Sequence, residues 1–243
     1  MKTKYLILIR LYFKLVNKII IALDTNNLDK AIRISKKIKN KIFTVKLGLE
    51  FFNAHGKEGV KKINQAGINN LMLDLKLKDI PETVYKSIKV LNDINFGFIT
   101  VHGQGGKAMI DGAKKAANEI ECKPKIMMVT ILTALNDKDL EIMGNTNTVN
   151  EQVEKLAKIA KDMNVGVVCS GHEAKIVRKI IGPDLLIFTP GIRLENNNKD
   201  DQKRVCTPKE SIKNGSNKII MGRSIVNGDI EENLNKVSHS LKV

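Results

Sequence analysis

The chain has 243 residues and a formal net charge of +15, from 41 Lys and Arg residues against 26 Asp and Glu residues. Its hydrophobic share of 42% and charged share of 28% are ordinary for a globular protein, and they exclude a disordered chain, a collagen-like repeat and a protein with many membrane spans. A positive surplus of this size predicts either a polyanionic partner or a small anionic substrate.

Residues 1–17 are predicted to form an N-terminal extension whose role the sequence leaves open. The apolar run at 5–9 resembles the core of a signal peptide, but Arg10 and Lys14 interrupt the segment and no small-residue cleavage site follows. No stretch of the sequence is long and apolar enough to span a bilayer, so we expect no membrane partner.

Eight short apolar runs follow, and several are continuous rather than alternating, which is typical of strands buried on both faces. Amphipathic stretches between them predict helices. This alternation predicts a single-domain (β/α)₈ barrel, a TIM barrel of the α/β class, over residues 18–243. The alternative is an open doubly wound sheet, but the first turn, residues 23–27, lacks a glycine-rich phosphate fingerprint. The predicted strands are 19–23, 43–47, 71–75, 96–101, 126–132, 165–169, 185–188 and 218–221, and the predicted helices are 28–38, 57–66, 82–92, 106–117, 149–163 and 173–181.

Charged side chains close the first three predicted strands, at the end of the barrel where active sites lie. Asp24 ends the first strand, Lys46 lies near the end of the second, and Asp74 and Lys76 end the third. Residues two apart on a strand share a face, so Asp74 and Lys76 are predicted to point together into the barrel mouth. A structural ion pair is the simpler interpretation of one Asp-x-Lys, but Asp24, Lys46 and Asp79 in the next turn favour a catalytic array. Such an array can repel a substrate carboxylate and protonate a carbanion, and both effects favour loss of carbon dioxide.

A second cluster follows the seventh and eighth predicted strands, whose loops commonly bind phosphate in barrels. The seventh strand leads into Thr-Pro-Gly-Ile-Arg at 189–193, and the eighth into Gly222 and Arg223. Arg223 offers a planar fork for a phosphate group, and Gly222 allows close approach of the backbone. A solvated loop with a turn glycine is the alternative, but the position of the cluster favours a phosphate site.

From about Lys18 onward, the sequence resembles the bacterial branch of the orotidine 5′-phosphate decarboxylase family. The resemblance rests on Asp-x-Lys-x-x-Asp-Ile at 74–80 and on the 189–193 motif followed by Asp-Gln-Lys-Arg-Val at 201–205. Two positions depart from the family pattern: Lys78 stands where a histidine is common, and Ala134 where a serine often follows the threonine.

The resemblance implies decarboxylation of orotidine 5′-phosphate to UMP, the last step of de novo pyrimidine biosynthesis, without metal or organic cofactor. It implies that Lys76 donates the proton to C6 of the pyrimidine and that Lys46, Asp74 and Asp79 complete the charged array. It also implies a homodimer in which Asp79 and Ile80 are shared across the interface. The substrate-binding residues that it implies are Asp24 for the ribose, Thr133 for the base region, Gln202, Gly222 and Arg223 for the phosphate, Arg193 for support of the same loop, and Lys46 and Ile80.

The Cys and His residues fit neither a disulfide framework nor a metal site, and we expect reduced cysteines in a cytoplasmic protein. They are scattered along the chain as Cys122, Cys169, Cys206, His55, His102, His172 and His239. The closest alternative is a sugar-phosphate decarboxylase or aldolase of the same superfamily, which uses a magnesium ion. The loop with Gln202 and the lack of a further acidic ligand after the second strand argue against it.

The lysines lie along the whole chain, mostly on the solvent faces of predicted helices, as at Lys36, Lys37, Lys114 and Lys115. Aromatic residues make up only 4% of the chain and Trp is absent, so the stacking platforms of single-stranded nucleic-acid binders are scarce. A basic nucleic-acid-binding barrel is therefore the weaker alternative. We expect the charge to serve a nucleotide-sized substrate and expect no nucleic-acid partner.

Overall fold

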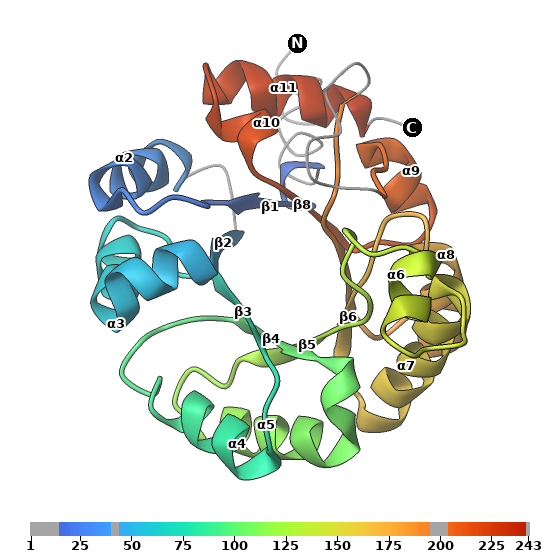
Figure 1. Ribbon diagram of the computed structural model, residues 1–243. Coiled ribbons are helices and arrows are strands. Elements are labelled where there is room, and N and C mark those ends of the chain that lie inside the picture. The colour runs from blue at the N-terminus through green and yellow to red at the C-terminus, as the bar shows by residue number, and fades with distance from the viewer. Residues whose placement is uncertain (1–14, 40–43, 195–203, 242–243) are drawn as a thin grey trace.

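The computed structural model describes residues 15–39, 44–194 and 204–241, which form a closed barrel of eight parallel strands in chain order. Figure 1 shows the strands around a central axis with the helices outside them. Because β1 pairs with β8, the sheet has no open edge, which confirms the predicted TIM barrel and rules out the doubly wound sheet. The strands are β1 Ile19–Ala22, β2 Thr44–Gly48, β3 Leu71–Leu77, β4 Phe98–His102, β5 Lys125–Val129, β6 Gly166–Val168, β7 Ile187–Thr189 and β8 Lys218–Met221.

The strands are buried on both faces, as their continuous apolar runs predict. In β1, Ile20 points to the interior of the barrel, while Ile19 and Ile21 pack in the larger core against the helices. The buried members of the interior core, among the described residues, lie on strands. They include Phe98 and Phe188, whose rings are edge to face with centroids 5.0 Å apart. This filled interior leaves the carboxyl ends of the strands as the place for a cavity.

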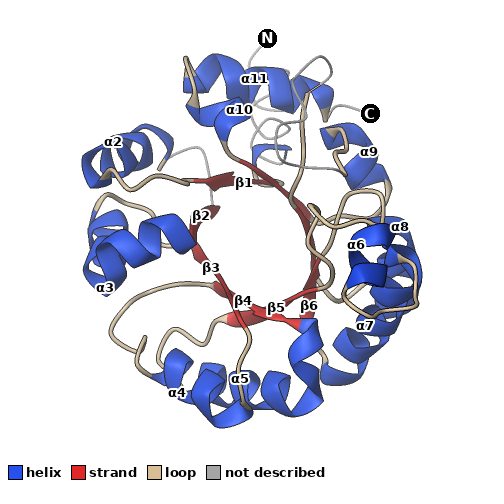
Figure 2. Ribbon diagram, viewed as in Figure 1, coloured by secondary structure: helices blue, strands red, loops and turns tan. Residues whose placement is uncertain are grey.

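Six helices follow the predicted pattern and form the outer layer, drawn in blue in Figure 2. The predicted bounds are correct for two of them, Leu28–Ile38 and Val149–Met163. The helix predicted from residue 57 begins at Leu49 instead, because Gly56 (φ 53°) interrupts its helical geometry and with it the amphipathic pattern. The six are α2 Leu28–Ile38, α3 Leu49–Gln65, α4 Pro81–Lys89, α5 Gly106–Glu119, α7 Val149–Met163 and α8 Ala174–Ile181, with the 3₁₀ turn η1 Gly103–Gly105 before α5.

The remaining helices were not predicted, and three of them are too short to show an amphipathic period. Two begin with a capping box, Asn136 with Asp139 and Thr207 with Glu210, and this local signal could have located them. The short helix after β8 begins at Arg223, so it places one of the predicted phosphate ligands. These helices are α6 Asp137–Ile142, α9 Pro208–Lys213, α10 Arg223–Val226 and α11 Ile230–Ser240.

Strand β3 departs from the regular pleat that the sequence argument assumed. Its pairing with β4 shifts register between Leu73 and Leu77, which face Ile99 and Val101, so four steps along β3 match two along β4. Within this shift Lys76 has a φ of 48°, in the left-handed region that residues with a Cβ rarely adopt. The end of β3 is therefore a bulge, and the position of Lys76 does not follow from simple alternation.

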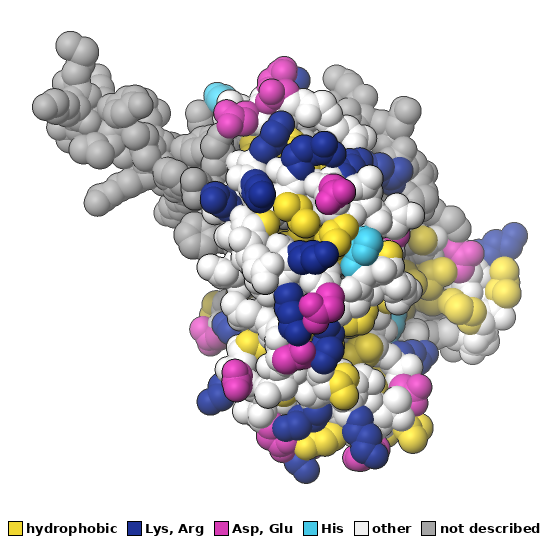
Figure 3. All heavy atoms as spheres, turned by 90° about the vertical axis from the view of Figure 1, so that its left-hand side faces the viewer, with side chains coloured by type: hydrophobic (Ala, Val, Ile, Leu, Met, Phe, Trp, Pro, Cys, Tyr) yellow, Lys and Arg dark blue, Asp and Glu magenta, His cyan; other side chains and the backbone are white. Residues whose placement is uncertain are grey.

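The last residues of the predicted extension pack against the barrel: Leu15 and Val16 are buried in the outer core, whereas residues 1–14 lie outside the described part of the chain. Among the residues described, no helix is long and apolar enough to cross a membrane. On the face shown in Figure 3, Lys and Arg side chains are scattered, with Asp and Glu side chains between them. The positive surplus on that face is therefore dispersed.

Candidate active site

A cavity of about 630 Å³ opens at the carboxyl ends of the strands. Asp79 and Ile80 are exposed and are not part of its wall, and Gln202, with the rest of 195–203, lies outside the described residues. The predicted site residues that line the cavity are Asp24, Lys46, Asp74, Lys76, Thr133, Arg193, Gly222 and Arg223.

Four of these side chains form a chain of alternating charge. The ammonium of Lys46 lies 3.0 Å from Asp24 Oδ1 and 3.2 Å from Asp74 Oδ2, and the ammonium of Lys76 lies 2.9 Å from the same Asp74 oxygen. The side chains of Lys46 and Asp74 are only 11% and 10% exposed, and that of Lys76 is 30% exposed. The Asp24 side chain, at the other end of the array, is 55% exposed, so the array runs from a buried centre to the solvent.

The charges of Lys46 and Asp74 are stabilised by their neighbours. Burial by itself raises the pKa of Asp74, but the ammonium groups of Lys46 and Lys76 outweigh it and hold this pKa below its ordinary value. Burial by itself lowers the pKa of Lys46, but Asp74 and Asp24 prevail and raise it. Both groups are therefore ionised at neutral pH, and neither is left as an isolated buried charge.

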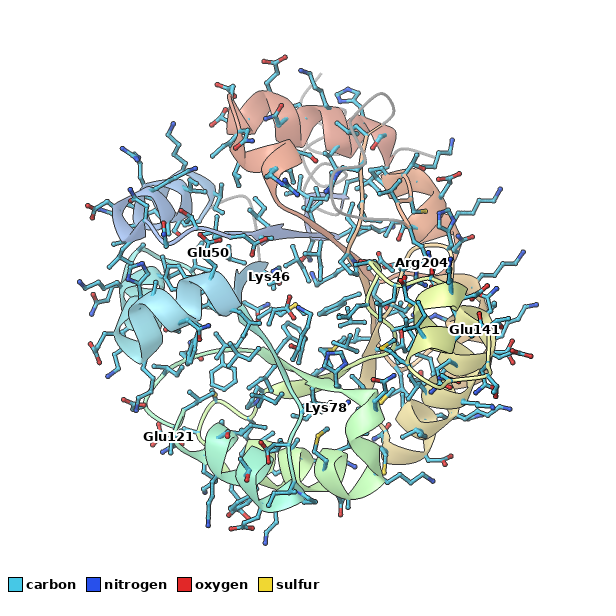
Figure 4. All side chains as sticks on the ribbon, in the orientation of Figure 1. Lys46, Glu50, Lys78, Glu121, Glu141 and Arg204 are labelled. Atoms are coloured by element: carbon cyan, nitrogen blue, oxygen red, sulfur yellow. The ribbon has the colours of Figure 1, made fainter. Side chains whose placement is uncertain are left out.

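Two neighbours of the array were missed by sequence reasoning. A Cβ on Gly48 would lie 3.1 Å from Asp24 Oδ1 and 3.2 Å from Lys46 Nζ, so a side chain here would crowd the ion pair. Glu50, in the first turn of α3, lines the cavity and accepts a hydrogen bond from the Asn26 N–H (3.1 Å). Glu50 corrects the argument that no further acidic residue follows the second strand, and Figure 4 shows it beside Lys46.

The array faces an apolar wall. Four apolar residues line the cavity: Val129 of β5, Ile131 just after β5, Val168 of β6 and Ile220 of β8. Thr133, which is 8% exposed, lies on the loop after β5 together with Ala134. This combination suits a flat, partly apolar ring whose polar edge meets the charged array.

Two cationic side chains lie where a phosphate site is predicted, after β7 and β8. Arg193 and Arg223 line the cavity, and Gly191 has a φ of 73°, which favours glycine. A Cβ on Gly222 would meet Ala22 Cβ at 3.4 Å and Asp24 Oδ2 at 3.8 Å, so it would point toward the cavity. Guanidinium groups suit an anion such as a phosphate, and both arginines line the same cavity as the apolar wall.

Arg204 is a further residue whose role sequence reasoning missed. It lies across the barrel mouth from Lys46 (Figure 4), and its Nη2 donates to the carbonyl oxygens of Leu132 (2.8 Å) and Ile131 (3.3 Å). Its guanidinium also pairs with Glu173, whose side chain is 3% exposed. Through these hydrogen bonds, Arg204 connects the backbone just after residue 203 to the loop after β5, which carries Thr133.

Two other groups near the array are neutral. Burial raises the pKa of the Cys169 thiol, which lines the cavity, to about 12, so this thiol is protonated at neutral pH and is a poor nucleophile. The pKa of His102 at the end of β4 is lowered by burial and by the positive charges of Lys76 and Lys78. Neither group therefore adds a charge to the array at pH 7. Separately, the described residues contain no cluster of three or more His, Cys, Asp or Glu side chains that could bind a metal ion.

Asp79 stands apart from the array in this single chain. Its Oδ1 accepts the N–H of Ile80 (2.7 Å), and it forms no ion pair with any described lysine or arginine. The adjacent residue, Ile80, is 66% exposed. The described part of one chain therefore leaves the fourth predicted member of the array, and the apolar residue next to it, exposed.

Comparison with known proteins places the chain in a family. The sequence model of the orotidine 5′-phosphate decarboxylase / HUMPS family matches residues 17–235. The orotidine 5′-phosphate decarboxylase of Wolbachia pipientis is 42% identical over 212 residues, which cover 86% of this chain and 92% of that protein, and the one of Fusobacterium nucleatum is 38% identical over 217 residues (88% and 91%). The crystal structure of the Lactobacillus acidophilus orotidine 5′-phosphate decarboxylase superposes with a TM-score of 0.80 at 34% identity, over 93% of this chain and 100% of that one. The chain therefore belongs to the orotidine 5′-phosphate decarboxylase / HUMPS family.

Proposed function

We propose that this enzyme decarboxylates orotidine 5′-phosphate to UMP in pyrimidine biosynthesis, with no metal or organic cofactor. The observation that supports this most directly is the Lys46–Asp74–Lys76 arrangement, with two ammonium groups on one oxygen of a buried carboxylate. It faces an apolar wall suited to a pyrimidine, and cationic residues suited to a phosphate line the same cavity. The proposal agrees with relatives about 40% identical that carry this name.

The proposed mechanism uses binding energy from the remote phosphate to hold the reacting ring against the array. Arg193 and Arg223, with Gln202 from the 195–203 segment, bind the phosphate, and Asp24 binds the ribose. The orotate carboxylate then lies against Asp74, whose negative charge opposes it. As the C6–carboxylate bond breaks and carbon dioxide leaves, the electron pair remains on C6. The Lys76 ammonium stabilises that charge and then transfers a proton to C6, and solvent returns the proton to Lys76.

The position of Lys46 argues against the magnesium-dependent alternative. Its ammonium lies between the carboxylates of Asp24 and Asp74, at 3.0 and 3.2 Å from their oxygens. A divalent cation bridging two carboxylates would need this space, and the ammonium already neutralises them. Glu50 is a further acidic group in the wall, but its Oε1 already accepts the Asn26 N–H.

The test is decarboxylation of orotidine 5′-phosphate in the presence of excess EDTA, followed by the loss of substrate absorbance. We expect the same turnover with EDTA as without it, because the charges that act on the substrate belong to side chains. No turnover of orotidine 5′-phosphate in either condition would reject the proposed function. Turnover that EDTA abolishes and Mg²⁺ restores would favour the metal-dependent alternative.

The pH dependence of kcat follows from the pKa directions of the array. Asp74 has a lowered pKa, so its carboxyl group is fully ionised above the ordinary value of 3.8. It becomes protonated only as the pH falls through the lower value of the folded protein. Lys46 has a raised pKa, so its charge is complete below 10.5 and is lost as the pH rises through the higher folded value. We expect kcat at saturating substrate to show no limb from either group between about pH 5 and 9. An acid limb within that range that disappears in Asp74→Asn would show that the lysines do not hold Asp74 ionised.

We also propose that the enzyme is a cytoplasmic homodimer in which Asp79 and Ile80 of each subunit complete the other subunit's site. The exposed position of Asp79 outside its own array supports this, as does the exposed apolar side chain of the adjacent Ile80. In a symmetric dimer, a second subunit can cover Ile80 and receive the carboxylate next to it.

A further inference from the structure

We propose that Thr100 is a positioning residue for the decarboxylation: its hydroxyl fixes the backbone of Lys76 and the carboxylate of Asp74 relative to each other. This inference rests on the proposed function of the site. Thr100 lies in the middle of β4, is fully buried, and is not part of the cavity wall, so it acts on the substrate only through its two neighbours.

The first contact lies at the bulge of β3. Between Leu73 and Leu77, where the register with β4 shifts, Lys76 has no paired residue on β4. Its N–H donates instead to Thr100 Oγ1 at 2.8 Å. At the bulge, the Lys76 N–H has no backbone acceptor on β4, and the Thr100 hydroxyl accepts its hydrogen bond instead. Lys76 is also the residue with a φ of 48°.

The second contact follows from the chemistry of a hydroxyl. An amide N–H can only donate, so Thr100 Oγ1 must accept from Lys76, and its own proton remains available. The Thr100 hydroxyl donates this proton to Asp74 Oδ1 at 3.0 Å. A carboxylate can only accept, so the direction of both hydrogen bonds is determined without observing a hydrogen atom.

The two contacts divide the oxygens of Asp74 between separate tasks. Oδ1 is held by Thr100, and Oδ2 receives the ammonium groups of both Lys46 and Lys76. Because Oδ1 is held by a group from the rigid sheet, the carboxylate cannot rotate freely about its Cβ–Cγ bond. The same hydroxyl holds the backbone from which the Lys76 side chain starts. Thr100 therefore sets the position of the proton donor and of the carboxylate with one atom.

Accurate positioning contributes to the rate, since a shift of about 1 Å away from the reactive geometry can cost on the order of 100-fold. Replacing Thr100 with Val keeps the shape of the side chain and removes both hydrogen bonds. We expect Thr100→Val to lower kcat about 10- to 100-fold while KM changes less than about threefold, because the phosphate and ribose contacts remain. Thr100→Ser keeps the hydroxyl and is expected to retain kcat within about threefold of wild type.

Thr44→Val is the matched control. Thr44 is also a fully buried strand threonine, but it begins β2 at the end of the barrel opposite the cavity, and its hydroxyl accepts a hydrogen bond from the Asn70 amide at 3.0 Å. We expect it to lower the thermal midpoint as Thr100→Val does, while kcat stays within about threefold of wild type. If Thr100→Val does not fold, Thr100→Cys, which has a side chain of similar size and weaker hydrogen bonding, takes its place with the same expected loss.

Several results would overturn the proposal: wild-type kcat in a folded Thr100→Val or Thr100→Cys, an equal loss in Thr100→Ser, or an equal loss in Thr44→Val. Amide hydrogen exchange at Lys76 is a readout that needs no turnover, and we expect it to be faster in Thr100→Val than in wild type. This separates the two proposals. A wild-type protein without activity on orotidine 5′-phosphate would reject the proposed function, whereas unchanged exchange at Lys76 would reject the role of Thr100.

Discussion

Replacing Lys76 with Ala is expected to abolish turnover of orotidine 5′-phosphate, with kcat lowered at least ~10⁴-fold. The substitution removes the proposed proton donor, whose ammonium in this proposal also stabilises charge at C6, and these two effects would act in the same step. It also leaves Asp74 Oδ2 with one cation, Lys46, in place of two. The measurement is kcat at saturating substrate over long incubation, since the remaining rate is expected to be near the limit of detection.

The control for this variant separates chemistry from binding and folding. We expect Lys76→Ala to bind UMP within about tenfold of the wild-type affinity, because the phosphate and ribose contacts lie on other strands. Lys57→Ala is the matched substitution: Lys57 also pairs with an aspartate, Asp93 at 2.8 Å, but on the outer helix layer. It should leave kcat unchanged. Activity of Lys76→Ala close to that of wild type would contradict the role of Lys76 as proton donor.

The position of Lys76 also shows how far sequence reasoning reached. The continuous apolar runs were enough to predict the barrel, because a strand buried on both faces has no need of alternation. The proximity of Asp74 and Lys76 was predicted from the period of a regular strand. The proximity is confirmed at 2.9 Å, but the strand is not regular there: Lys76 lies in a bulge with a φ of 48°. The two charged side chains reach each other across the irregular backbone because the lysine side chain is long and flexible.

The supporting residues of the array could not be predicted because their contacts cross between strands. Thr100 bonds Asp74 from 26 residues away, and Gly48 is restricted only by the ion pair of Asp24 and Lys46 that forms beside it. Neither residue is unusual in its local sequence, since a threonine in a strand and a glycine before a helix are both common. Their roles depend on which strands become neighbours and on the register between them, and a single sequence contains little information on either.

Asp79 differs from Thr100 and Gly48: its sequence motif predicts a catalytic role, but within the described part of a single chain it makes no contact with the array. The Asp-x-Lys-x-x-Asp-Ile motif predicts that it belongs to the array, yet its carboxylate bonds only the N–H of Ile80 among the contacts of the described residues. A carboxylate three residues after Lys76 that faces away from its own cavity can still act if a second subunit presents its cavity there. The exposed side chain of Ile80, adjacent to Asp79, would then be covered by that subunit.

A mixture of Asp79→Ala and Lys76→Ala proteins is therefore expected to regain activity that neither variant has alone. In the proposed dimer Lys76 and Asp79 of one site come from different subunits, so a mixed dimer would carry both substitutions in one site and none in the other. Random exchange makes half of the dimers mixed with one intact site each, so recovery is expected to approach about a quarter of wild-type activity. The measurement is kcat after the subunits are unfolded and refolded together, with differently tagged chains to verify mixed dimers. The same activity as the unmixed variants, in verified mixed dimers, would mean that each subunit uses its own Asp79 and that the exposed position of this carboxylate has another cause.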